Sequence, residues 1–384
     1  MFLRTLPIYL VFLLMGVADA MGPLSSRVSD NPVMAALMPF SVFIAFALFS
    51  VPSGVLAARI GKKNLLLLGL GLCVIATAVP SFMDPPFAML LAAIFLLGVG
   101  TTFMQVSGNP IMRDVGSEGA YSRNLAMAQG IKGLGSWASS FFGAAGITLA
   151  IFAAMDWRGV FPIFCIVFAL AFLLVALLKV SEAKADAPPS IGDCLALLKN
   201  PTFALAVLGI FLYVGAEVCM GANLIPAFED HGFGAKEAAF YGPSLFFLLI
   251  AVGRLIAGSV KANPRTFFKI SAALGLIGVA MVLTGLKMLL IPAVVIAALG
   301  FANIWPMLFS ITVEEKPERS SELSGLMCMA ICGGALVPLL MAWLGGGAVA
   351  LAFIVPALCF AYLLLLSLRK QRAVAQQEQE PKQG

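Results

Sequence analysis

The chain has 384 residues, of which 61% are hydrophobic and 11% are charged, and its mean hydropathy is +1.01. These charged residues are too few to cover the surface of a soluble domain. The composition therefore excludes that class and indicates a polytopic membrane protein. The formal net charge of +5 arises from loop residues that set the membrane topology, so we expect no nucleic-acid partner.

Twelve apolar stretches of membrane-spanning length follow one another along the chain. About 20 apolar residues form one helical crossing, and these runs are too long and continuous for the strands of a barrel. The predicted spans lie near residues 3–26, 32–58, 65–83, 86–112, 124–152, 159–180, 202–228, 236–260, 266–287, 290–313, 321–344 and 347–368. The sequence therefore predicts an all-α membrane protein with twelve transmembrane helices.

A polar segment rich in charges and prolines divides these spans into six and six. We expect an N-terminal six-helix bundle at 1–180, a cytoplasmic linker at 181–201, a C-terminal six-helix bundle at 202–370 and a cytoplasmic tail at 371–384. The halves share a short pattern, because residues 16–22 and 215–221 each hold a carboxylate flanked by glycines. Such internal duplication is typical of transporters.

Lysine and arginine are distributed unevenly between the two sides of the predicted membrane. With the N-terminus inside, eighteen of the 24 fall on the cytoplasmic side and four on the other, while Lys132 and Arg254 lie within spans. Short loops rich in these residues stay in the cytoplasm. We therefore expect both termini in the cytoplasm of a bacterial inner (cytoplasmic) membrane, with the first stretch a span rather than a signal peptide.

Three spans carry an ionisable residue near the middle: Asp19, Lys132 and Glu217. A charge at mid-bilayer costs about 2.5–3.5 kcal/mol even on lenient insertion scales, and it persists mainly where it faces a water-filled cavity or a partner. These residues therefore indicate function. The single histidine, His231, is predicted in an outer loop, and the cysteines form no ligand cluster, so neither a metal site nor a cofactor is expected.

Residues 54–63, Gly-Val-Leu-Ala-Ala-Arg-Ile-Gly-Lys-Lys, resemble a loop motif of the major facilitator superfamily. Ala58 replaces the Asp that helps to latch the two halves in that superfamily. Arg59 and the lysines after it would act in gating or anchor the topology. The resemblance implies two six-helix bundles around a central cavity that opens alternately to either side.

Within the fourth span, residues 98–110 resemble the Gln/Glu-x-x-x-Asn-Pro helix of the fucose:galactose:proton symporter branch of that superfamily. Similar matches occur at 213–218, 253–255, 303–310 and 324–338. Gln105 and Asn109 lie four apart and so share one helix face, where their amides would suit sugar hydroxyls. Alternatively, they hydrogen-bond a neighbouring helix. Pro110 is expected to break this helix near its cytoplasmic end.

The fifth span departs from the branch pattern, because Lys132 stands where the family has a polar, sugar-facing residue. Just before it, Ala128 and Gln129 match the Ala-Gln of the family pattern. Lys132 could bind an anionic substrate group, pair with Asp19 or Glu217, or extend to the cytoplasmic interface. The first two roles can coexist, since a substrate anion and a carboxylate would compete for one cation.

Asp19 and Glu217 are the candidate proton-coupling residues, since burial and a nearby cation act on a carboxyl in opposite directions. Glu217 could instead be a structural, protonated residue between helices. Arg254 is interpreted as a helix-end or gate residue. The remaining substrate-binding candidates are Asn303, Trp137 and Trp305, whose aromatic rings would suit the apolar face of a pyranose or simply pack in the core.

The sequence therefore predicts a monomeric secondary transporter rather than an enzyme, since it offers no nucleophile–base constellation and no phosphate loop. Its leading function is proton-coupled uptake of a monosaccharide, with an acidic or N-acetylated sugar favoured because of Lys132. The alternative is a facilitator or exporter of another small organic anion or drug.

Overall fold

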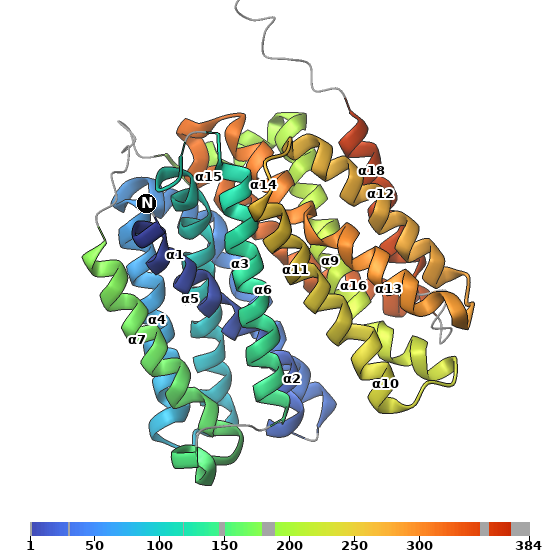
Figure 1. The fold of residues 1–384 in the computed structure, drawn as a ribbon. Helices are drawn as coiled ribbons and strands as arrows, with labels where there is room; N and C mark the ends of the chain where they lie inside the picture. Colours follow the sequence, from blue (N-terminus) through green and yellow to red (C-terminus); the bar gives the residue numbers. More distant parts are fainter. Residues whose placement is uncertain are drawn as a thin grey trace, which may run out of the picture.

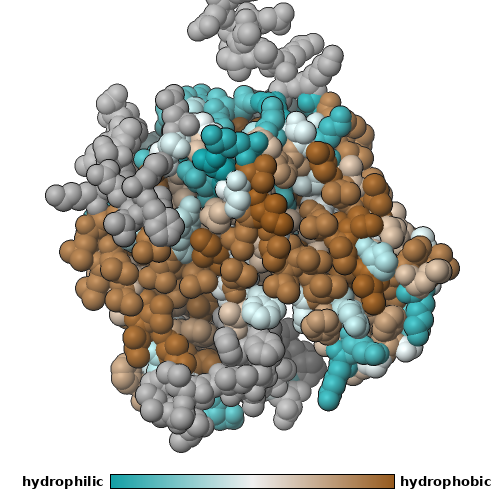
Figure 2. All heavy atoms as spheres, in the orientation of Figure 1, coloured by the Kyte–Doolittle hydropathy of each residue, from teal (hydrophilic) through white to brown (hydrophobic). Residues whose placement is uncertain are grey.

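The computed structural model describes residues 2–29, 31–117, 119–145, 150–178, 189–345 and 353–369. All regular secondary structure in these ranges is helical. Figure 1 shows two groups of helices side by side, the first built from the N-terminal half of the chain and the second from the C-terminal half. An apolar belt crosses the middle of the molecule, and hydrophilic residues gather at the end where both halves of the chain begin (Figure 2).

The first half contains, in chain order, α1 (Phe2–Met15), η1 (Gly16–Ala20), α2 (Met21–Val28), α3 (Pro32–Ile60), α4 (Lys62–Phe82), α5 (Phe87–Asp114), α6 (Tyr121–Ala145), η2 (Ala150–Val160) and α7 (Phe161–Leu177). Two short helices follow in the linker, α8 (Ile191–Ala196) and η3 (Leu197–Lys199). α5 has 28 residues, so it is about 42 Å long at 1.5 Å per residue. That length exceeds the roughly 30 Å hydrocarbon core of a bilayer.

The second half contains α9 (Pro201–Asp230), α10 (Ala235–Ala239), η4 (Phe240–Ser244), α11 (Leu245–Ser259), α12 (Pro264–Leu283), α13 (Lys287–Ala302), α14 (Ile304–Glu314), η5 (Pro317–Arg319), α15 (Ser320–Met329), η6 (Ala330–Cys332), α16 (Gly333–Gly345) and α18 (Ile354–Leu368). Among the described residues, nine helical segments are long and apolar enough to cross a membrane, and Leu6–Asp19 and Ile354–Leu368 are apolar but shorter. With α6, the elements correspond to the twelve predicted spans.

Several spans expected as single helices are interrupted in the structure. The first becomes a 3-10 turn at Gly16–Ala20, which carries Asp19, and the tenth breaks at Asn303 between α13 and α14. The eleventh contains the 3-10 turn η6, and the eighth contains a π turn at Phe240–Ser244. Glycine or proline lies in or beside each interruption, which weakens or removes the local helical hydrogen bonds.

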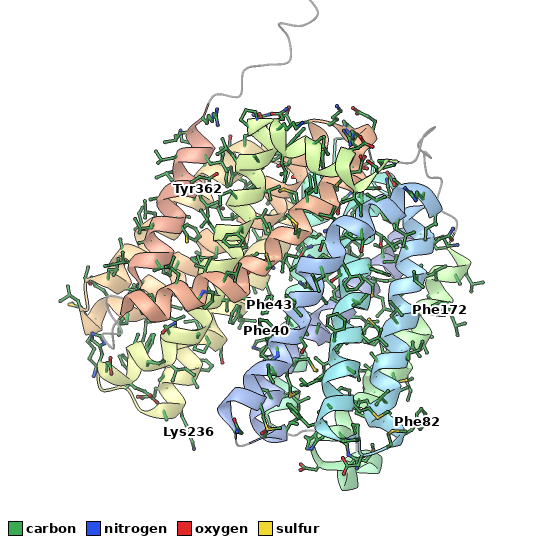
Figure 3. All side chains as sticks on the ribbon, turned by 180° about the vertical axis from the view of Figure 1, so that it is seen from behind. Phe40, Phe43, Phe82, Phe172, Lys236 and Tyr362 are labelled. Carbon is green, nitrogen blue, oxygen red and sulfur yellow. The ribbon has the colours of Figure 1, made fainter. Side chains whose placement is uncertain are left out.

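The two halves meet at the end that holds the linker, which is called the linker end below. There α3 packs on α15 and α6 packs on α11. The α3–α15 crossing needs glycine, since a Cβ at Gly54 would lie 2.7 Å from the Ser321 carbonyl oxygen and one at Gly325 would lie 2.8 Å from that of Ser50. At the other end α2 and α10 stand apart in both views, with Phe40 and Phe43 of α3 at the boundary between the halves (Figures 1 and 3).

The linker helix α8 is attached to both halves. Arg59 of α3 donates to the Pro189 carbonyl oxygen (3.3 Å), and Arg319 donates to the Asp193 carbonyl oxygen (2.9 Å). The Cys194 thiol donates to the Glu322 carbonyl oxygen at the start of α15 (3.5 Å). Hydrogen bonds from Ser190, which caps α8, hold the pKa of the Asp193 carboxyl below its usual value. Arg59 therefore contacts the linker, in the region where sequence predicted a gate or an anchor.

The basic loop after α3 carries an ion pair within the first half. Lys62 at the start of α4 lies 2.6 Å from the carboxylate of Asp114 at the end of α5, and both side chains are largely buried. This pair joins two helices of one half. Ala58, where the family has an Asp, cannot contribute a charge to it.

Candidate functional site

A close crossing of η1 and α6 places Asp19 beside α6. A Cβ at Gly16 would overlap the Ser136 amide nitrogen, and one at Gly135 would overlap the Leu13 carbonyl oxygen, so only glycine permits this approach. Asp19 then accepts a hydrogen bond from the Ser136 hydroxyl (2.6 Å). Its side chain is exposed although it lies in the middle of the first span. Asp19 is thus an exposed carboxylate in a span that is otherwise largely apolar.

Lys132 lies one helical turn before Ser136 on α6 and is partly exposed. Within the described part of the chain, no carboxylate lies within ion-pair distance of its ammonium. It is near enough to Cys328 of α15 to act on that thiol electrostatically. The pairing of Lys132 with Asp19 or Glu217, one of the roles considered from sequence, is therefore not formed in this conformation.

The predicted amides of α5 and α6 form a buried cluster. Gln129 donates to the Asn109 side-chain oxygen (3.1 Å), and Asn109 donates to the Cys328 sulfur across the boundary between the halves (3.7 Å). Gln105, one turn before Asn109, is 1% exposed, and its side-chain oxygen has no hydrogen-bond partner. Asn109 is thus engaged between helices, whereas Gln105 keeps an open acceptor.

Pro110 does not break α5, so the predicted interruption is wrong. The helix continues to Asp114 because a partner from the other half supplies the missing donor. Proline at 110 removes the N–H that would bond the Val106 carbonyl four residues earlier. The Ser324 hydroxyl of α15 donates to that carbonyl instead (2.7 Å), and this hydrogen bond joins the two halves.

Replacing Ser324 with Ala should shift the protein away from this conformation. The Val106 carbonyl would lose its donor while it stays buried, at a cost of about 1–3 kcal/mol. We expect distances between spin labels on the linker-end surfaces of the two halves to lengthen. The Ser259→Ala variant is the control, because the Ser259 hydroxyl donates to the Leu255 carbonyl of its own helix. Unchanged distances in Ser324→Ala would contradict this role.

A second polar cluster lies in the other half and centres on Arg254. Its Nη2 atom donates to the Tyr213 hydroxyl (2.9 Å) and lies 3.3 Å from a carboxylate oxygen of Glu217. Its Nε atom donates to the Ala302 carbonyl oxygen (2.9 Å). Arg254 is 7% exposed. The structure therefore places Arg254 in a buried ion pair with Glu217, rather than at the helix end that sequence suggested.

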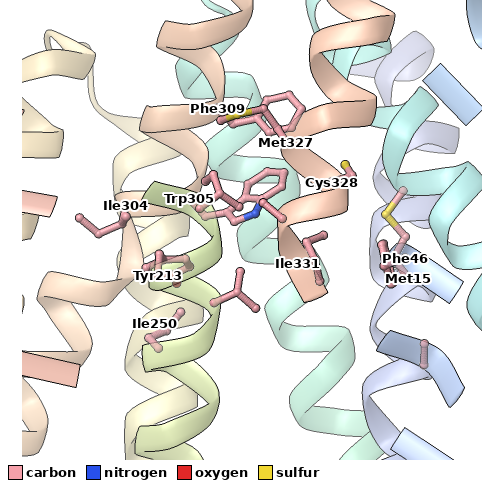
Figure 4. Packing of buried hydrophobic residues seen from close by; sticks show 14 of the residues in the cluster. Met15, Phe46, Tyr213, Ile250, Ile304, Trp305, Phe309, Met327, Cys328 and Ile331 are labelled. Atoms are coloured by element: carbon pink, nitrogen blue, oxygen red, sulfur yellow. The ribbon is translucent and has the colours of Figure 1, made fainter. Parts of the chain in front are cut away.

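Asn303 and Trp305 flank the break in the tenth span. The Asn303 amide donates to the Gly253 carbonyl oxygen (3.4 Å), while its side-chain oxygen is buried without a partner. The Trp305 ring stacks on Phe309 at a centroid distance of 4.7 Å. Figure 4 shows Trp305 and Phe309 one above the other, with Cys328 on the neighbouring helix across from them. The other predicted aromatic residue, Trp137, is 39% exposed.

Sequence reasoning missed four residues of these clusters: Tyr213, Ser136, Ser324 and Cys328. Tyr213 lies one turn before Glu217, and Ser136 lies one turn after Lys132, so helical spacing could have indicated both. Ser324 could have been sought as a donor for the carbonyl that Pro110 leaves open. Cys328 lacks such a signal, because its contact with Asn109 spans 219 positions.

A family model described as "Major Facilitator Superfamily" matches residues 2–327 of the chain. The chain belongs to this superfamily. The predicted family, the all-α membrane fold and a transporter rather than an enzyme are thereby confirmed.

Relatives and solved structures extend this result. The chain is 28% identical to a glucose/galactose transporter of Brucella abortus over 361 residues, which cover 88% of this chain and 85% of that protein. It is 24% identical to the L-fucose-proton symporter of Escherichia coli, covering 87% and 84%. A crystal structure of the Escherichia coli fucose:proton symporter matches with a TM-score of 0.78 at 21% identity, covering 94% of this chain and 97% of that one.

Proposed function

We propose that this protein takes up a monosaccharide together with protons by alternating access. The observation that carries the proposal is a pair of buried, unpartnered acceptors, the side-chain oxygens of Gln105 in the first half and Asn303 in the second. Buried polar groups without partners are rare in native proteins. Both amides lie within the predicted spans, so sugar hydroxyls, which are donors, would satisfy them. The names of the relatives support the same class of substrate.

The distribution of Lys and Arg supports a cytoplasmic linker end, with both termini in the cytoplasm and the helices in a bacterial inner membrane. The conformation described above, in which α3 packs on α15 and α6 packs on α11 at the linker end, is then closed toward the cytoplasm. In this arrangement a sugar enters from outside, and the halves rock about the central site to release it inside. In that step α3 and α15 separate at their close contact around Gly54 and Gly325.

Asp19 is the proposed proton carrier. It is an exposed mid-span carboxylate that accepts a hydrogen bond from Ser136, and it lies within electrostatic range of Arg254 from the other half. Protonation removes a charge at the boundary between the halves, which favours their rearrangement. Glu217, the other carboxylate suggested by sequence, has a permanent counter-charge in Arg254, because a guanidinium stays protonated in proteins.

Lys132 supports a preference for an acidic or N-acetylated sugar within this class. A cation at mid-membrane gains most from an anion held in a region of low dielectric. The same residue is the one observation that favours the alternative, a carrier of another small organic anion.

Transport by purified protein in proteoliposomes tests the proposal. The panel comprises D-galactose, D-glucose, L-fucose, D-glucuronate, N-acetylglucosamine and a non-sugar anion such as lactate, each with and without an inward proton gradient. Accumulation of a sugar above the outside concentration only when the gradient is imposed supports the proposal. Transport of lactate alone would favour the alternative, a carrier of another small organic anion. Sugar that only equilibrates across the membrane, equally with and without the proton gradient, would exclude proton coupling.

The two amides of α5 are expected to respond differently to alanine. Gln105→Ala should weaken sugar affinity by about 1–3 kcal/mol, because the substrate loses a buried hydrogen bond, while thermal stability changes little. Asn109→Ala breaks the contacts with Gln129 and Cys328. It should therefore lower thermal stability in addition to sugar affinity. Calorimetric titration and melting curves measure the two effects. Unchanged sugar affinity in Gln105→Ala would show that this amide lies outside the site.

A further inference from the structure

The break in the tenth span leaves a backbone carbonyl without its helical donor. The Ala302 carbonyl would normally bond the N–H four residues later, but residue 306 is proline and has none. An unsatisfied backbone group in lipid costs several kcal/mol. The break therefore persists only if another group supplies the donor.

Arg254 of α11 supplies it. Its Nε atom bonds the Ala302 carbonyl (2.9 Å), and its Nη2 atom bonds Tyr213 and Glu217 of α9. One planar guanidinium thus links three helices, in a geometry that the point charge of a lysine cannot reproduce. Glu217 compensates the charge, and the hydroxyl of Tyr213, which is fully buried, accepts from the same Nη2 atom.

A second hydrogen bond joins the residues adjacent to Arg254 and Ala302. Gly253, immediately before Arg254, accepts the hydrogen bond from the side-chain amide of Asn303, immediately after Ala302 (3.4 Å). With its nitrogen held in this way, the amide leaves its oxygen as the open acceptor. The orientation of that acceptor thus depends on the hydrogen bonds between α11 and the break in the tenth span.

We propose that Arg254 is a positioning residue for substrate recognition: through the Ala302 carbonyl it fixes the α13–α14 break and so aims the Asn303 side-chain oxygen at a substrate hydroxyl. Glu217 is then the fixed counter-ion of Arg254 and does not carry the transported proton. The recognition step rests on the function proposed above. The mechanical step, from Arg254 to the break, does not.

Amide hydrogen exchange without sugar tests the mechanical step in a double-mutant cycle. Arg254→Lys keeps the charge for Glu217 but cannot bridge all three partners, so we expect faster deuterium uptake in residues 300–308. Pro306→Ala restores an N–H that can bond the Ala302 carbonyl, so adding Arg254→Lys to it should leave exchange there nearly unchanged. Equal increases in both backgrounds would overturn the proposal, because Arg254 would then act independently of that carbonyl.

Binding of the sugar that the wild type transports best tests the recognition step. Arg254→Lys should weaken its affinity about tenfold, the loss expected for one buried hydrogen bond, with little further loss when combined with Asn303→Ala. Additive losses in the double variant would mean that Arg254 acts by a route other than Asn303 and would overturn this step. If Arg254→Lys proves unstable, Tyr213→Phe replaces it, because it removes one hydrogen bond to the guanidinium. Its loss of sugar affinity should be smaller and should likewise add little to that of Asn303→Ala. A wild type that carries no sugar would refute the proposed function but leave the exchange result standing.

Discussion

Asp19→Asn is expected to abolish accumulation of sugar against a gradient while exchange of sugar across the membrane continues. Asparagine retains an oxygen that can accept the Ser136 hydrogen bond, so the local geometry is preserved. The proton-binding group is lost, so the imposed pH gradient no longer drives uptake. The measurement compares sugar accumulated in proteoliposomes with and without an inward proton gradient, next to counterflow of labelled sugar.

Two matched variants make this result specific. Asp84→Asn removes an exposed carboxylate near Arg158, far along the chain from the site, and should accumulate sugar like the wild type. Glu217→Gln keeps an acceptor for Arg254 and should lower the rate of uptake without ending accumulation. Full accumulation by Asp19→Asn would refute Asp19 as the proton carrier. Loss of accumulation in Glu217→Gln would assign the transported proton to Glu217 instead.

The spans were predictable because a bilayer demands long apolar helices, which leave a direct record in the sequence. The same physics singled out Asp19, Lys132 and Glu217 as candidates, since charges at such positions are costly. Sequence also placed Gln105 and Asn109 on one helix face through their spacing, and the family resemblance added Gln129 as a substrate-binding candidate. In the structure the last two are hydrogen-bonded directly.

The partner of each charge was not predictable. Arg254 and Glu217 are 37 positions apart and lie on different helices, and no short-range pattern records that they meet. The effect of proline depends on such distant partners too. Pro110 leaves α5 continuous because Ser324 reaches Val106, whereas the tenth span breaks before Pro306 and Arg254 takes the free carbonyl.

Lys132→Gln is expected to reduce affinity for an acidic sugar far more than for a neutral one. A charged hydrogen bond contributes about 1.5–3 kcal/mol, so D-glucuronate should bind ten- to hundredfold more weakly to the variant. D-galactose, which offers the ammonium no countercharge, should change by much less. Calorimetric titration of both sugars against the wild type and the variant measures the difference.

The position of the cation, rather than the net charge of the protein, must account for this selectivity. Lys236→Gln removes the same charge from the exposed helix α10 at the far end of the second half (Figure 3) and should leave both affinities unchanged. Salt should weaken any effect of Lys236, whereas a pair held inside the protein is screened much less. If Lys132→Gln reduces both affinities equally, Lys132 acts through a partner within the protein in another conformation, and the sugar that this transporter carries is neutral.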